Sequence, residues 1–144
     1  MSGGTSGGRA NPQQGVLADT SVFIGLENDR FDRASVLWTD MQANMAVSVV
    51  TIAELRLGVL TARTLEARGK RLATLRFAEL LEPLPVDDAV ADAWALLVAA
   101  LRSEGRKREV NDTWIAATAI ARHLPIATQD AGYHDLPGVS VVRL

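Results

Sequence analysis

Short apolar runs separated by much longer stretches of helical period are the feature that most constrains this fold. The runs lie at residues 16–18, 46–50, 84–86, 125–128 and 139–142. They are almost continuously apolar instead of alternating, which is typical of parallel strands covered on both faces. The pattern predicts an α/β fold, a three-layer α/β/α domain with a parallel sheet of about five strands. The run at 84–86 is predicted to be an edge strand because it contains Pro85 and directly follows Pro83.

One domain accounts for the length of 144 residues. Residues 1–15 are Gly- and Ser-rich and are predicted to form a disordered tail, which leaves 16–144 as the domain. The longest apolar run, residues 93–101, is half of what a membrane span needs, so we expect no membrane association and a cytoplasmic protein. The chain lacks cysteine, which excludes disulfides, thiolate-bound metals and a cysteine nucleophile.

Four acidic residues are placed to meet at one edge of the predicted sheet. Asp19 and Asp130 follow strands, Glu54 lies one turn into the helix after a strand, and Asp112 opens a helix. Right-handed crossovers bring such positions to the same edge, although the acids are far apart in the sequence. Carboxylates that converge repel one another, and a hard divalent cation removes the repulsion. The arrangement predicts a Mg²⁺ or Mn²⁺ site suited to phosphoryl chemistry.

Each acid also has a structural explanation. Asp19 could cap a helix that begins near Ser21, and Glu54 could form a capping box with Thr51. Asp112 could be the N-cap of its helix, and Asp130 could form a turn toward Gly132. The conjunction of all four at one edge favours the functional interpretation.

Three segments resemble PIN-domain proteins, specifically the VapC family of toxin ribonucleases from toxin–antitoxin pairs. They are VLADTSVFIGL at 16–26, VSVVTIAELRLGVL at 47–60 and NDTWIAATAIARHLPIATQD at 111–130. The resemblance implies a type II toxin that acts as a metal-dependent endoribonuclease. It implies cleavage of RNA phosphodiesters by metal-activated water, leaving a 5′-phosphate and a 3′-hydroxyl.

The resemblance also assigns roles to residues. Asp19 and Asp112 match the direct metal ligands of the family, and Glu54 and Asp130 complete the catalytic pocket as further ligands, directly or through water. Hydroxyls that orient a carboxylate or a water are expected from Thr20, Ser21 and Thr128.

The implied partners are RNA and a cognate VapB-type antitoxin whose C-terminal segment occludes the active site. A homodimer within the toxin–antitoxin complex is expected too. Apolar residues near the N-terminal helices are candidates for the surface that binds the antitoxin or a second copy: Val22, Phe23, Phe31 and Trp38.

A formal net charge of −2 by itself argues against a nucleic-acid partner, but the charge is unevenly distributed. Two basic blocks, at 56–76 and 102–108, are expected to line a groove for RNA phosphates, unless they are ordinary solvated surfaces. The residues selected from the first block are Arg56, Arg68, Lys70 and Arg71.

Other functions remain open at this point. A structure-specific DNA nuclease would use the same acids, and a non-catalytic PIN-like interaction module would not need all four. A histidine-based ribonuclease has only His123 and His134 available. A haloacid-dehalogenase-type phosphatase needs a second aspartate two residues after the first, where this chain has Ser21.

Overall fold

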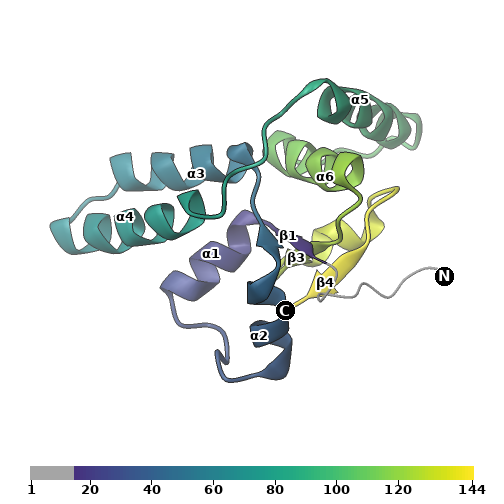
Figure 1. Ribbon diagram of the computed structural model, residues 1–144. Helices are drawn as coiled ribbons and strands as arrows, with labels where there is room; N and C mark the ends of the chain where they lie inside the picture. The colour runs from purple at the N-terminus through teal and green to yellow at the C-terminus, as the bar shows by residue number, and fades with distance from the viewer. Residues whose placement is uncertain (1–14) are drawn as a thin grey trace.

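The computed structural model describes residues 15–144 and shows a small parallel sheet between two groups of helices (Figure 1). The strands are β1 (Val16–Ala18), β2 (Met45–Ala46), β3 (Ile126–Thr128) and β4 (Val141–Arg143). The helices are α1 (Thr20–Glu27), α2 (Val36–Ala43), α3 (Val49–Leu60), α4 (Leu65–Glu79), α5 (Asp88–Ser103) and α6 (Val110–Arg122), with a 3₁₀ helix, η2 (Ala131–Asp135).

All the strand pairs are parallel, in the order β2-β1-β3-β4. β1 therefore lies between β2 and β3, and the carboxyl ends of β1 and β3 are neighbours. Leu17 is in register with Ile126, and Ala18 with Ala127. This register sets the residues that follow the two strands beside each other.

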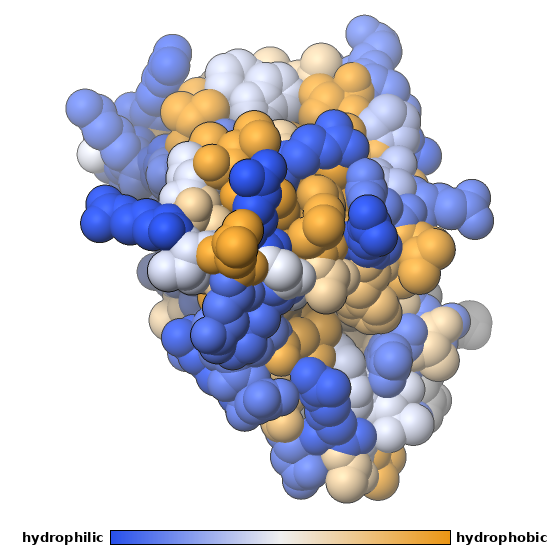
Figure 2. Space-filling model, turned by 90° about the vertical axis from the view of Figure 1, so that its left-hand side faces the viewer, coloured by the Kyte–Doolittle hydropathy of each residue, from blue (hydrophilic) through white to orange (hydrophobic). Residues whose placement is uncertain are grey.

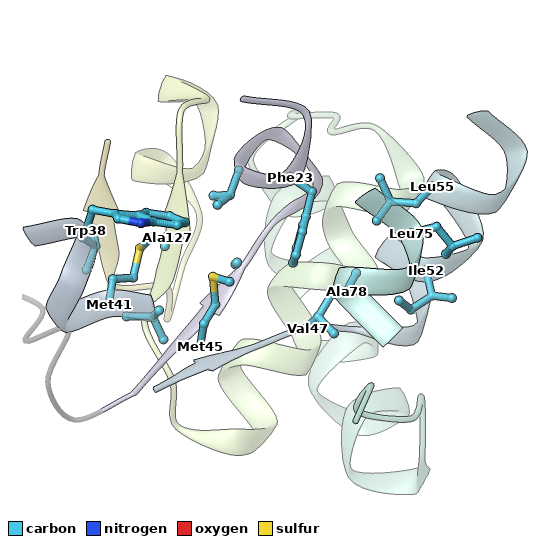
Figure 3. Packing of buried hydrophobic residues seen from close by; sticks show 14 of the residues in the cluster. Phe23, Trp38, Met41, Met45, Val47, Ile52, Leu55, Leu75, Ala78 and Ala127 are labelled. Carbon is cyan, nitrogen blue, oxygen red and sulfur yellow. The ribbon is translucent and has the colours of Figure 1, made fainter. Parts of the chain in front are cut away.

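Side chains of successive strand residues enter opposite layers, as the period of two requires. Val16 and Ala18 pack with α1, α2, α3 and α4, whereas Leu17 packs with α5 and α6. Figure 1 shows α3 beside α4 on one side of the molecule and α5 beside α6 on the other. Figure 3 shows the first layer, in which Phe23 and Trp38 lie among aliphatic and methionine side chains. The three-layer prediction is confirmed.

The sheet has four strands instead of about five. Residue Leu84, in the predicted edge strand, makes only a single parallel bridge with Ser48. Its amide donates to Val47 O and its carbonyl accepts from Val49 N, but Pro83 and Pro85 on either side have no N–H with which to extend the ladder.

The second predicted strand, 46–50, is shorter than expected. β2 ends at Ala46, and α3 begins at Val49 because the Ser48 hydroxyl accepts a hydrogen bond from Val50 N and caps the helix. The β-branched Val49 and Val50 are therefore helical. A local cap has overridden their strand propensity.

The predicted tail, 1–15, lies outside the described residues except for Gly15. That residue is buried with a φ of +103°, a conformation that favours glycine, where the chain enters β1.

The free end of the α3–α4 pair exposes apolar side chains among hydrophilic ones (Figure 2). Leu57 and Leu60 on α3 and Leu65 on α4 are largely exposed, Leu65 to 88%. No helix in the described part of the chain is long and apolar enough to span a membrane.

We expect Phe23→Ala to lower the free energy of unfolding by about 3–5 kcal/mol, because it empties a fully buried ring site that contacts Phe77. The matched control is Ile24→Ala, the next residue of α1, which is 41% exposed and should cost less than about 1 kcal/mol. Urea denaturation measures both. Equal losses would contradict the packing of the first layer.

Candidate active site

Asp19 lies at the junction of β1 and α1 and is almost completely buried, with 4% of its surface exposed. It occupies the N-cap position but makes no side-chain cap hydrogen bond. Instead, Ser21 Oγ donates to Oδ1 at 2.6 Å and Thr128 Oγ1 donates to Oδ2 at 2.9 Å. The carboxylate is thus held by hydroxyls from α1 and the end of β3.

Burial raises the pKa of Asp19 to about 6, even though the hydrogen bonds from Ser21 and Thr128 lower it. The nearby charge of Asp112 raises it further. A carboxylate that is costly to ionise and lies near a second one favours a cation.

The three predicted hydroxyls all contact acids. Thr20 Oγ1 donates to Glu54 Oε1, and Ser21 and Thr128 donate to Asp19. Thr128 Oγ1 also accepts from Asp130 N at 2.8 Å, which ties the loop after β3 to the same network.

Glu54 lies in the second turn of α3 and is half-buried. The capping box with Thr51 does not form, since Ser48 caps α3 and Thr51 is inside the helix. Glu54 Oε2 accepts from Asn111 Nδ2 at 3.4 Å. This contact links α3 to the start of α6, where Asp112 lies.

Asp112 is in the first turn of α6, which is capped by Glu109. Tyr133 Oη donates to Asp112 Oδ1 at 3.0 Å. Burial and the charges of Asp19 and Asp112 raise the pKa of Tyr133, so the phenol stays protonated and remains a donor. Burial also raises the pKa of Asp112.

Arg108 bridges Asp112 and Asp130. Its Nη2 lies 3.1 Å from Asp112 Oδ2 and 2.7 Å from Asp130 Oδ2. Asp130 also makes the predicted turn, accepting from Gly132 N at 2.8 Å. Its pKa is lowered first by that backbone N–H and then by Arg108.

The guanidinium of Arg108 fits closely into its surroundings. Its central carbon lies 5.0 Å from the centre of the Tyr133 ring, a cation–π geometry. A Cβ at Gly132 would come within 1.7 Å of Arg108 Nη1, so the guanidinium lies where any other side chain would begin. A larger residue at 132 would force the guanidinium to move from its position between Asp112 and Asp130.

Sequence reasoning missed the roles of Arg108, Tyr133 and Asn111. Arg108 was grouped with a basic block, although its spacing of four residues before Asp112 on a predicted helix start is a usable signal for an ion pair. Tyr133 and Asn111 gave no such signal, because their contacts come from segments distant in sequence.

The oxygen-rich donor set fits a hard divalent cation. Thr128 links Asp19 to the backbone of Asp130, and Arg108 links Asp130 to Asp112. Glu54 contacts Thr20 and Asn111 instead. No three acidic or histidine side chains of residues 15–144 lie close enough together to hold a metal ion as they stand. Arg108 instead neutralises Asp112 and Asp130.

The predicted basic residues on α3 and α4 lie apart from this network. Arg56 pairs with Glu79 at 3.0 Å, and Arg71 Nη1 donates to Gly58 O at 2.7 Å. Arg68 is exposed, and Lys70 lines a groove beside α1 and α2.

The two histidines are exposed, and neither forms a hydrogen bond or ion pair with the four acids. His123 ends α6 in a left-handed conformation, and His134 Nδ1 lies 3.2 Å from Ala131 O. The histidine-based chemistry gains no support.

Asp19→Asn is expected to stabilise the metal-free protein at neutral pH. Unfolded aspartate ionises near pH 3.8, whereas the folded carboxyl ionises near 6, so the folded state holds the proton longer and loses stability as pH rises between these values. Asparagine does not ionise, so it removes this loss of stability. The free energy of unfolding should rise by about 2–3 kcal/mol above pH 7, and the increase should shrink toward pH 4.

Thermal unfolding in EDTA of both proteins from pH 4 to 8 measures the effect. A difference in stability that does not depend on pH would contradict the raised pKa of Asp19.

Comparison with known proteins agrees with this geometry. The PIN domain model matches residues 16–139. Ribonuclease VapC4 of Mycobacterium tuberculosis is 50% identical over 132 residues, which is 90% of this chain and 96% of the relative. Ribonuclease VapC5 of the same organism is 46% identical, over 92% of this chain and 95% of the relative.

Solved structures show the same fold. The VapBC-5 toxin–antitoxin structure from M. tuberculosis superposes with a TM-score of 0.77 at 42% identity, over 90% of this chain and 98% of the other. FitAcB from Neisseria gonorrhoeae gives a TM-score of 0.67 at 28% identity, over 88% and 95%. The acids that follow β1 and β3 and these similarities agree: the chain belongs to the PIN-domain family, and within it to the VapC ribonucleases.

Proposed function

We propose that this protein is the toxin of a type II toxin–antitoxin pair, a Mg²⁺- or Mn²⁺-dependent endoribonuclease acting in the cytoplasm. The observation that carries the proposal is the buried carboxylate of Asp19, held by Ser21 and Thr128 within the electrostatic reach of Asp112. An enclosed pair of acids of this kind is suited to a cation and, with it, to phosphodiester hydrolysis.

Asp19 and Asp112 are the proposed direct ligands, and Glu54 and Asp130 the supporting ones. A cation bound there would neutralise phosphate charge and lower the pKa of a bound water. The protein's own contribution is orientation: Thr20 and Asn111 fix the two oxygens of Glu54, and Tyr133 fixes one oxygen of Asp112. The proposed products carry a 5′-phosphate and a 3′-hydroxyl.

The proposed partner is a VapB-type antitoxin. A groove of about 490 Å³ between α1, α2 and α4 has apolar walls from Leu26, Trp38 and Phe77 and a charged rim that includes Glu27 and Lys70. Such a groove suits an amphipathic helix.

Of the four apolar residues expected to form this surface, Val22 and Phe23 are fully buried and were wrong as surface candidates. Trp38 lines the groove, and the half-buried Phe31 stacks on it at 5.5 Å.

The homodimer and the RNA-binding role of Arg56, Arg68, Lys70 and Arg71 remain proposals. The exposed leucines at the free end of α3 and α4 offer a surface to a second copy (Figure 2). For the basic residues, the intramolecular contacts of Arg56 and Arg71 leave Arg68 and Lys70 as the side chains with more freedom to meet phosphate.

Asp112→Asn is expected to reduce Mg²⁺-dependent cleavage of RNA by on the order of 100-fold or more, since even changes behind the ligands of a metal site cost 10–100-fold. EDTA should abolish cleavage by the wild type, and added Mg²⁺ or Mn²⁺ should restore it. Sequencing the RNA ends made by the wild type but not by the variant identifies the cut sites and the end chemistry.

Asp92→Asn, an exposed position on α5, is the matched control and should cleave normally. Cleavage that survives EDTA would contradict the metal dependence. Cleavage of flap DNA in preference to RNA would favour the DNA-nuclease alternative.

Arg108→Met should make the metal-free protein less stable, by about 1–2 kcal/mol, because Asp112 and Asp130 lose their shared counterion while remaining partly exposed to solvent. Mn²⁺ should then raise the melting temperature of the variant more than that of the wild type. Arg106→Met, which breaks only an exposed pair with Glu104 and a bond to Asp135 O, is the control. An equal response of all three proteins to Mn²⁺ would show that Arg108 does not act as the internal counterion.

A further inference from the structure

A pocket of about 370 Å³ lies between the end of α5 and the start of α6, beside the acids. Its volume falls in the range of small-ligand sites. Trp94, Val98 and Leu101 supply apolar walls, and Gly105 leaves one side without a side chain. Apart from Arg108, none of the lining residues has a role in the mechanism proposed above.

Only basic side chains supply charge to this pocket: Arg102, Arg106, Lys107 and Arg108. Two of them are already neutralised, since Arg106 pairs with Glu104 and Arg108 with Asp112 and Asp130. Arg102 and Lys107 are exposed and have no carboxylate partner among the described residues. An apolar pocket with unpaired cations at its rim complements a nucleotide, which has an apolar base and an anionic phosphate.

The pocket shares structural elements with the acid network. Arg108 lines the pocket and contacts Asp112, and Val110 and Thr113 line it from the same first turn of α6 that carries Asp112. A strand of RNA with a phosphate at the acids therefore has its next nucleotide within reach of the pocket.

Trp94 is fixed in place. Its Nε1 donates to Thr113 Oγ1 at 2.9 Å, and its ring stacks on Trp114 with centroids 4.5 Å apart and planes 9° from parallel. The indole is thus held on one face and satisfied at its polar edge, and it contributes apolar surface to the pocket. An aromatic surface that is already ordered favours stacking, because little side-chain freedom is lost on binding.

We propose that this pocket is a nucleotide subsite, in which a base of the RNA neighbouring the scissile phosphate packs on Trp94 and the adjoining phosphate meets Arg102 and Lys107. The inference rests on the proposed ribonuclease function and adds to it the place where the substrate is held.

The test compares Val110→Glu with Leu96→Glu. Val110 lines the pocket and is 60% exposed at the start of α6, where a glutamate is tolerated by the helix. Leu96, 68% exposed on α5, does not line the pocket and receives the same charge as a control. Circular dichroism confirms that both variants fold. The probe is a fluorescein-labelled single-stranded RNA of mixed sequence, with EDTA present to prevent cleavage, followed by fluorescence anisotropy.

Val110→Glu is expected to weaken RNA binding by about 10-fold or more, the loss of one base stack, while Leu96→Glu stays within about 2-fold of the wild type. The double variant Arg102→Gln/Lys107→Gln should reduce the slope of log Kd against log salt by about 1.4, the value for two phosphate contacts on a single strand. With Mg²⁺, Val110→Glu should raise KM for RNA more than it lowers kcat.

Equal RNA affinity for Val110→Glu and the wild type, with normal Mg²⁺-dependent cleavage, would overturn the subsite and leave the ribonuclease function standing. Equal weakening by Val110→Glu and Leu96→Glu would also overturn it, because the effect would then reflect total charge. Wild-type protein that neither binds nor cleaves RNA would overturn the ribonuclease function together with the subsite.

Discussion

The free-energy cost of ionising the buried carboxyl of Asp19 is the constraint around which the site is arranged. The parallel pairing of β1 with β3 places the residue after β1 beside Thr128, at the end of β3. Within residues 15–144, no arginine or lysine forms an ion pair with Asp19. Hydroxyl groups from Ser21 and Thr128 contact its carboxylate, so its charge is solvated by dipoles and remains costly. The fold thus holds an unfavourable negative charge at a place where a bound cation would relieve it. Activity is obtained at a cost in stability of the metal-free protein.

Asp112 and Asp130 are handled differently, although they belong to the same edge of the sheet. Arg108 neutralises both. Its guanidinium lies over the face of Tyr133 and occupies the space that a side chain at Gly132 would fill. Among the described residues, the site therefore contains two acids without an ion-pair partner, Asp19 and Glu54, and two that share Arg108. An arginine so placed limits repulsion in the metal-free protein, and it also joins the acids to the neighbouring basic pocket. The formal charge of −2 conceals this local arrangement.

Much of the fold and site was predictable, for physical reasons that particular residues illustrate. Val16–Ala18 and Ile126–Thr128 are short and fully buried, and both form central strands. Asp19 follows the first strand directly, and Asp130 lies two residues after the second. Glu54 shows where prediction stopped. Its spacing from Thr51 fits a capping box, but the cap is Ser48, and Glu54 contacts Thr20 and Asn111 instead. Ser48 and Thr51 are both residues that cap helices, so the local sequence is compatible with either helix start; in the structure Ser48 is the cap and Thr51 lies inside the helix.

The sequence by itself determined the α/β alternation, the parallel sheet and the placement of Asp19 and Asp130 just after two of its strands, because hydrophobic period and crossover handedness are local or topological properties. Only the tertiary structure decided the partners of each acid. Arg108 and Asp130 are 22 residues apart in the sequence, and Thr128 and Asp19 are 109 apart. Tyr133, in η2, contacts Asp112 across 21 residues. Whether a hydrogen bond or ion pair forms depends on differences in distance of a few tenths of an ångström. Such distances are set by packing between layers, which no local pattern of residues contains.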